Sequence, residues 1–245
     1  MEVHHHAHTE RKKWTHYFWE FLMLFLAVFC GFLAEYQLEH KIEKDKEKQY
    51  IQSLVEDLST DTANLHKVID NFNKRIRNID TLLALFPRLS QGYNQQLYQK
   101  LEAIKGFADF VKADRTMQQL KNSGGMRLIR NKKAADAITE YDLTNRDLDI
   151  DITSLSELFN RLESSRFELF DEEALQTDMK EKTITELETG KKNYLLKSEK
   201  SFLGKFNNEI REFQIVCGFV RHSEEKLRTQ ATDLIRLLND EYNLK

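Results

Sequence analysis

Four histidines stand close together at the start of the chain, where they could chelate a metal ion. They are His4, His5, His6 and His8, in the sequence MEVHHHAHT. Neutral imidazoles this close can share one Zn²⁺, Ni²⁺ or Cu²⁺ ion. Their spacing is that of a flexible chelating tail, unlike the separated ligand pairs of a preformed site. Two interpretations remain open: metal capture, or a solvated tail whose histidines respond to pH at a membrane surface.

His16 and Glu20 form the next polar pair and lie one helical turn apart, at the edge of an apolar run. A carboxylate at the edge of a membrane helix can reach the lipid headgroups, whereas a deeper one needs a partner helix. Glu20 is therefore either an interfacial carboxylate or, together with His16, a polar contact between copies of the chain that lines a pore.

Sequence motifs for enzymatic chemistry are not found. The chain carries no phosphate-binding glycine loop, zinc-type Cys/His spacing, nucleophile elbow or His-Glu-x-x-His helix. Arg11 and His16 have the spacing of the Arg/His pair in a class of helical RNases, but they border the apolar run. The adjacent acidic pairs, Glu56-Asp57 and Glu172-Glu173, are interpreted as solvated surface. We therefore expect a non-enzymatic protein without a cofactor; a helical nuclease or hydrolase is the less favoured alternative.

Residues 14–34, WTHYFWEFLMLFLAVFCGFLA, are the one stretch that water would solvate poorly. Residues 21–34 carry no charged side chain, and the aromatic residues before them resemble an interfacial belt. About 20 residues at ~1.5 Å rise cross a ~30 Å hydrocarbon core. The stretch predicts a single-pass, uncleaved anchor, because Ala34 and Glu35 fit a signal-peptide cleavage site poorly. A buried core helix and an amphipathic surface helix are the alternatives.

Positive charges flank this span on both sides, so the positive-inside rule gives almost no preference for either orientation. Lysines and arginine at positions 11–13 precede it, and lysines at 41, 44, 46 and 48 follow it. The short, basic N-terminus favours an N-terminus-inside signal anchor in a bacterial inner (cytoplasmic) membrane.

Composition indicates an all-α protein. The 245 residues carry a net charge of −3 with both signs mixed, which gives no reason to expect nucleic acid as a partner. One proline and eight glycines leave few turns. Cys30 lies in the span and Cys217 in an apolar stripe, so a disulfide framework is excluded.

The order of elements follows from apolar residues recurring every three or four positions. We expect a His-rich basic tail at 1–13, a transmembrane helix at 14–34 and a soluble helical bundle at 35–245. Within the bundle we expect a long helix at 35–86, stopped by Pro87, and further helices at about 93–112, 115–122, 132–170 and 198–243. About four main helices would form an antiparallel, coiled-coil-like bundle.

A tight turn is expected in LKNSGGMRLIRN, where a glycine can take a positive φ at the helix end. Just after it, Arg127, Arg130, Lys132 and Lys133 form a local basic patch. The segment is either a structural turn alone or also a contact for an anion or partner.

Several segments resemble a bacterial family of single-pass, membrane-anchored helical proteins without an assigned function. They are MEVHHHAH, FLMLFLAVFCGFLAE, KEKQYIQSLVEDLSTDT and TMQQLKNSGGMRLIRNKKAADAITEYD, within the first 140 residues or so. The resemblance implies a membrane anchor and labels no catalytic residue.

Together these features favour a non-enzymatic, membrane-anchored scaffold that binds an unknown protein partner and self-associates. The alternative is a homo-oligomeric pore or channel-like assembly lined by the N-terminal helix, with His16 and Glu20 at its mouth.

Overall fold

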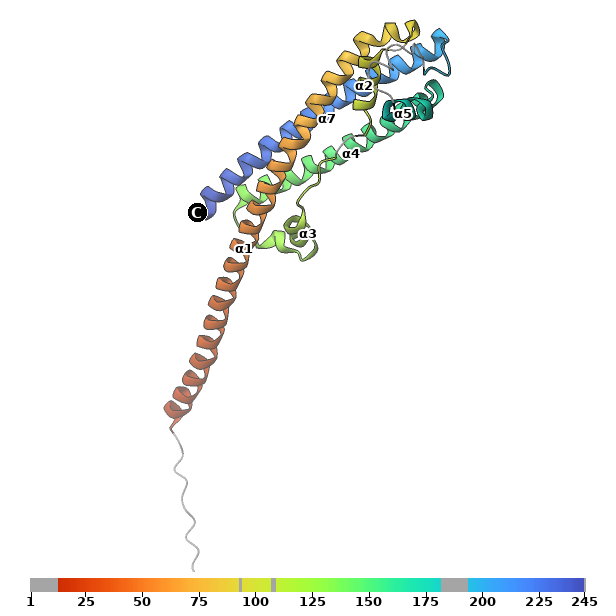
Figure 1. Cartoon of the computed structure of the whole chain (residues 1–245). Coiled ribbons are helices and arrows are strands. Elements are labelled where there is room, and N and C mark those ends of the chain that lie inside the picture. Colours follow the sequence, from red (N-terminus) through yellow and green to blue (C-terminus); the bar gives the residue numbers. More distant parts are fainter. Residues whose placement is uncertain (1–12, 93, 107–108, 182–193, 245) are drawn as a thin grey trace, which may run out of the picture. The chain divides into compact units, whose positions relative to one another are not determined.

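The computed structural model describes residues 13–92, 94–106, 109–181 and 194–244, and their regular structure is helical (Figure 1). Long helices are α1 (Trp14–Leu85), α4 (Lys132–Leu169) and α7 (Lys200–Tyr242). Shorter ones are α2 (Gln95–Ala103), α3 (Arg115–Asn122), α5 (Glu172–Glu181) and the 3₁₀ turns η1 (Phe86–Gln91) and η2 (Gly125–Leu128). The described residues contain no β-strand beyond an isolated bridge between Phe170 and Leu195. The predicted all-α class is confirmed.

Residues 1–49 form the first of two compact units, and its described part is the N-terminal portion of α1. The apolar side chains of this portion are exposed: Phe21, Leu24 and Phe32 have exposed fractions of 65–68%. By length and composition this one helix among the described residues could cross a membrane. The predicted long apolar N-terminal helix is therefore present.

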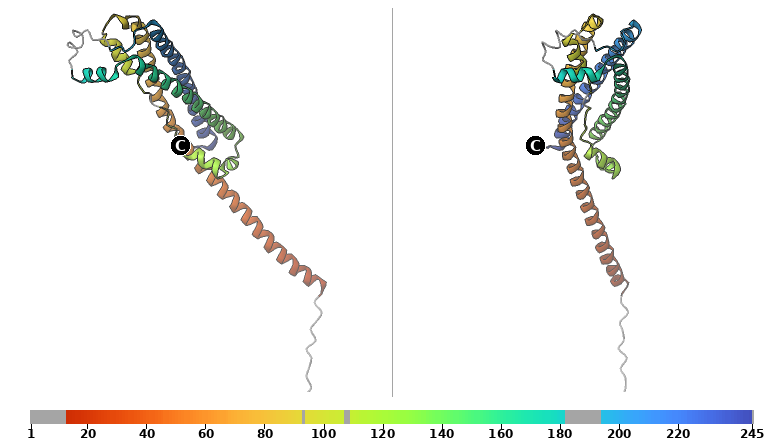
Figure 2. Two further views of the ribbon diagram at one scale, coloured as in Figure 1. Left: turned by 90° about the vertical axis from the view of Figure 1, so that its right-hand side faces the viewer. Right: turned by 45° about the vertical axis from the view of Figure 1, so that its right-hand side comes forward.

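Residues 50–245 form the second unit, a bundle in which α1, from Tyr50 onward, lies beside α4 and α7 (Figures 1 and 2). Asn73 of α1 accepts a hydrogen bond from Arg221 of α7 at 3.1 Å, and Phe86 packs on Phe206 further along. Residue numbers rise on α1 as they fall on α7, so these helices are antiparallel. The same holds for α4 and α7, which pair through Asp151 with Ser223 and through Phe159 with Phe213.

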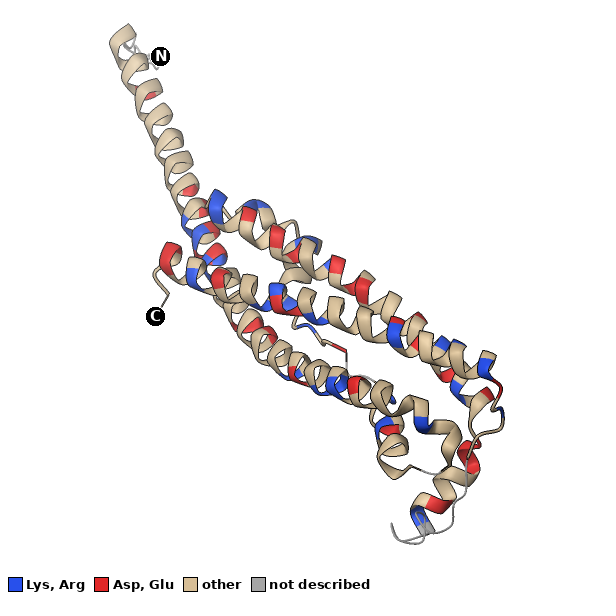
Figure 3. Ribbon diagram, turned by 90° about the horizontal axis from the view of Figure 1, so that it is seen from above, with Lys and Arg blue, Asp and Glu red and all other residues tan. Residues whose placement is uncertain are grey.

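The core of the second unit consists of the apolar stripes that the three- and four-residue spacing predicted. Fully buried side chains include Ile51, Leu58, Leu65, Ile79 and Leu82 on α1, Leu148, Leu155 and Leu162 on α4, and Ile210, Phe213, Val220 and Leu227 on α7. Lys and Arg alternate with Asp and Glu along the helices of this unit (Figure 3). Helix α1 ends at Leu85, immediately before the turn that contains Pro87.

The prediction that a helix extends over about 93–112 is wrong. Helix α2 ends at Ala103, and Gly106 has a φ of +62°, a left-handed conformation that ends a helix. Residues 104–106 and 109–114, which we call the strap, continue without a helix to α3. Polar side chains of α1 hydrogen-bond to three backbone groups of the strap, in place of the partners that a helix would provide.

The predicted turn after α3 is present. Gly124 has a φ of +67°, and the apolar residues on either side of it, Leu120 and Ile129, are buried. Asp114 occupies the N-cap position of α3, but its carboxylate makes no capping hydrogen bond.

Gly124→Ala is expected to destabilise the second unit by about 1–2 kcal/mol, because a side chain is strained at this φ although open space surrounds it. Gly204→Ala is the matched control. Gly204 is an exposed helical glycine with open space for a Cβ, so alanine there should stabilise the protein by up to about 1 kcal/mol. Urea unfolding in detergent, followed by far-UV circular dichroism, measures both; equal signs for the two variants would contradict the expectation.

Candidate functional site

The histidine-tail residues His4, His5, His6 and His8 lie outside the described residues, as does Arg11 of the RNase-like pair. His16 Nε2 lies 3.0 Å from Glu20 Oε1, and about half of each side chain is exposed. The two polar groups thus satisfy each other within one helix.

The four basic residues after the turn, Arg127, Arg130, Lys132 and Lys133, are all exposed. Lys133 Nζ lies 3.4 Å from Glu241 Oε1 near the end of α7. The Glu241 pKa is lowered by hydrogen bonds from Asn131 and Lys133. One end of the predicted patch is therefore paired with an acid, and an anion or partner contact stays a prediction.

Two buried aspartates on α1 attach the strap and α3 to the bundle. Asp61 Oδ1 accepts from the Ala113 amide at 2.6 Å, and Asp57 Oδ2 accepts from the Thr116 amide at 2.9 Å. Asp57 thereby caps the first turn of α3 from another helix, in place of the local Asp114. The interpretation of Asp57 as solvated surface is wrong: its exposed fraction is 7%, whereas its neighbour Glu56 is exposed.

A cleft of about 230 Å³ lies beside these aspartates and is lined by α1, the strap, α3 and α4. Five aspartates and three basic side chains line it: Asp57, Asp61, Asp114, Asp142, Asp149, Lys112, Lys121 and Arg146. Lys112 Nζ lies 2.6 Å from Asp149, and Lys121 and Arg146 both pair with Asp142. The basic groups are therefore already engaged, and the lining is acidic overall.

Asp61 and Tyr141 are coupled inside this cleft. The Tyr141 hydroxyl donates to Asp61 Oδ2 at 2.7 Å. Burial and the nearby Asp61 charge raise the Tyr141 pKa, which keeps the proton on the phenol. The Asp61 pKa is also raised, mainly by burial and in part by the charges of Asp57 and Asp114, against the lowering effect of its two hydrogen bonds.

Asn145 of α4 completes the lining with an unused acceptor. Its exposed fraction is 8%, and it hydrogen-bonds to the Tyr141 hydroxyl. Among the described residues, Asn145 Oδ1 has no hydrogen-bond partner. Over the same residues no three His, Cys, Asp or Glu side chains are arranged to hold a metal ion.

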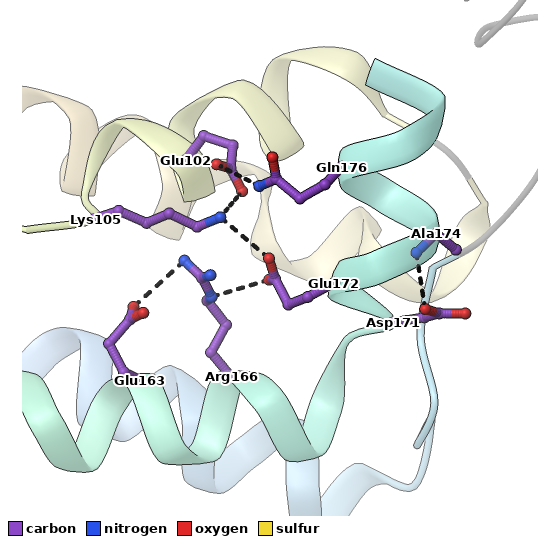
Figure 4. Close-up of polar contacts among 8 residues, drawn as sticks. All are labelled: Glu102, Lys105, Glu163, Arg166, Asp171, Glu172, Ala174 and Gln176. Atoms are coloured by element: carbon purple, nitrogen blue, oxygen red, sulfur yellow. Dashed lines mark hydrogen bonds and ion pairs between the residues drawn. The ribbon is translucent and has the colours of Figure 1, made fainter. Parts of the chain in front are cut away.

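A second polar cluster joins α2, α4 and α5 (Figure 4). Arg166, 3% exposed, lies 3.0 Å from Glu172 and 3.3 Å from Glu163. Lys105 pairs with both Glu172 and Glu102. Burial raises the Glu163 pKa, against the opposing effect of the Arg166 charge. Two cations bridge three carboxylates in this network, and the ion pair of Arg166 with Glu172 fastens α5 to α4. Glu172 is thus part of a network rather than solvated surface.

Glu224 is the most isolated buried acid of the described residues. Its exposed fraction is 0%, and neither carboxylate oxygen has a hydrogen-bond partner there. Burial raises its pKa to about 8, with smaller contributions from Asp109 and Glu225. Cys217, two turns earlier on α7, is a buried free thiol whose pKa burial raises to about 12.

Comparison with known proteins adds no further constraint. No protein-family model matches the chain, and no match was found to a curated protein or to a solved structure. The relationship to the bacterial family therefore stays a prediction from sequence motifs.

The sequence contained a signal for the buried acids. Asp57 and Asp61 lie one turn apart and share a helix face with buried Leu54, Leu58 and Leu65. Glu224 likewise interrupts the apolar stripe of α7. The identity of their partners, which lie far away along the chain, had no local signal.

Proposed function

We propose that this chain is a non-catalytic, membrane-anchored helical scaffold that self-associates and binds a protein partner. One observation supports the proposal of a membrane anchor: residues 14–34 form a helix whose large apolar side chains are exposed in the first unit. Exposed apolar surface of this extent is unfavourable in water and favourable in lipid. The expected location is a bacterial inner membrane with the N-terminus inside.

Exposed apolar side chains on the bundle support self-association. Ile215 and Phe219 lie one turn apart on α7, with exposed fractions of 59% and 66%. Two such side chains on one helix face offer contact area to a second copy. The polar clusters of the second unit support a structural rather than catalytic role, because Asp57, Asp61 and Arg166 hold helices and the strap together.

The pore remains the second candidate, because His16 and Glu20 place a polar pair on the apolar helix. Conductance of reconstituted bilayers, reduced or altered by Glu20→Ala, would favour it. A large oligomer without current would exclude it.

The anchor is tested by a charge placed in the span. Leu24→Arg should make insertion about 3 kcal/mol less favourable and lower the fraction of protein that resists carbonate extraction from membranes. Leu38→Arg, at a leucine beyond residue 34 that is also well exposed, is the control and should leave extraction unchanged. Identical extraction of both variants and the parent would reject the anchor.

Self-association is tested by the mass of the detergent-solubilised full chain. We expect an oligomer, and we expect the double variant Ile215→Lys/Phe219→Lys to lower its mass. Leu143→Lys, at an exposed apolar residue of α4, is the control. A monomeric parent protein would refute self-association.

A further inference from the structure

The acidic cleft between α1 and α4 contains buried oxygen atoms that can accept further hydrogen bonds. Asp57 Oδ1 is contacted by Arg115 at 3.4 Å, a long distance to a side chain that is 72% exposed. Asn145 Oδ1 is unpaired among the described residues, although the side chain is more than nine-tenths buried. A buried acceptor without a donor lowers stability, so its presence in a lined cleft points to a missing donor.

We propose that this cleft binds an organic ammonium group, held by Asn145 Oδ1 together with the carboxylates of Asp57 and Asp61. All three residues line the same cleft of about 230 Å³. An ammonium has three N–H donors and no acceptor, which complements three acceptors. The volume is several times the ~30 Å³ of a water molecule, so an alkyl chain also has room.

Electrostatics supports a cation over an anion or a neutral ligand. Five aspartates line the cleft against three basic side chains, and those three are paired with Asp142 and Asp149. The charges of Asp57 and Asp114 add to burial in raising the Asp61 pKa, which indicates uncompensated negative potential at this point. A bound ammonium would relieve that repulsion.

The ammonium could come from a free alkyl amine or from a lysine side chain of a partner protein. Both present the same chemistry to the cleft. The inference holds whether or not residues 14–34 cross a bilayer, so its test is independent of the anchor.

The test is calorimetric titration of the detergent-solubilised full chain at low salt with three probes. Butylamine represents a free alkyl amine, and Nα-acetyl-lysine amide represents a lysine side chain. Tetramethylammonium carries the same charge but no N–H donor. We expect saturable binding of at least one of the first two, which identifies the source, and at least about tenfold weaker binding of the third.

Asn145→Leu separates binding from structure. Leucine removes an unpaired buried acceptor, which favours the folded state, and also the hydrogen bond between Asn145 and the Tyr141 hydroxyl, which costs about 1 kcal/mol. The variant should therefore stay folded, while affinity for the amine falls at least about tenfold. Asn145→Asp adds a charge and should raise affinity, which tests the site even if the leucine variant misfolds. The inference is overturned if neither amine binds, if tetramethylammonium binds equally well, or if folded variants at residue 145 leave amine affinity unchanged.

Discussion

Replacing Asp61 with leucine is expected to lower the free energy of unfolding of the second unit by about 4 kcal/mol. Its two oxygens accept from the Ala113 amide and the Tyr141 hydroxyl, and its exposed fraction is 2%. Leucine would leave both donors without an acceptor in a buried place, and each such loss costs about 1–3 kcal/mol. The strap would also lose an attachment to α1.

Urea unfolding of the full chain in detergent, followed by far-UV circular dichroism, measures this effect. Asp61→Asn keeps an acceptor for Ala113 and should cost much less, and Tyr141→Phe, which removes one donor, should cost about 1 kcal/mol. Asp70→Leu, on an exposed face of α1, is the matched control and should stay within about 0.5 kcal/mol of the parent. Similar losses at residues 61 and 70 would contradict this account of the strap.

The helices could be predicted from the sequence because their signals are local. Apolar residues at three- and four-residue steps identified the buried faces of α1, α4 and α7. Pro87 and Gly124 marked chain reversals for reasons of backbone geometry alone. Phe202 is an exception within α7: its spacing continues the apolar stripe, yet it is 37% exposed, with the Lys197 ammonium over its ring.

The strap could not be predicted, because tertiary partners override its local pattern. Leu97, Leu101 and Ile104 have helical spacing and are buried, yet helix α2 stops at Ala103. Beyond it, Asn64 donates to the Val111 carbonyl at 3.2 Å, and Arg75 donates to that of Ile104 at 2.9 Å. These bonds join residues tens of positions apart, and no window of sequence contains both partners. The candidate cleft depends on the same long-range contacts.

In the parent protein, ionisation of Glu224 at rising pH is expected to lower the free energy of unfolding by on the order of 4 to 5 kcal/mol, and Glu224→Gln is expected to abolish this loss. Burial raises the folded-state pKa of Glu224 to about 8, from an ordinary value of 4.5. Between these values the folded protein holds a proton that the unfolded chain releases. The contribution of Glu224 to stability is therefore fully present below pH 4.5, is lost progressively as the pH rises to about 8, and changes no further above that.

Unfolding free energies at pH 5 and pH 8 measure this loss as a difference between the parent and the glutamine variant. The two proteins should be nearly equally stable at pH 5, and the variant should be the more stable at pH 8, because glutamine cannot ionise. Glu157→Gln, at an exposed position of α4, controls for the general effect of removing a carboxylate and should show no such divergence. Asp109 and Glu225 are the other acids that raise the Glu224 pKa. Asp109→Asn should therefore slightly reduce the loss of unfolding free energy between pH 5 and pH 8. Parallel pH profiles of the parent and Glu224→Gln would mean that this carboxylate is solvated or paired, contrary to its burial in the apolar stripe of α7.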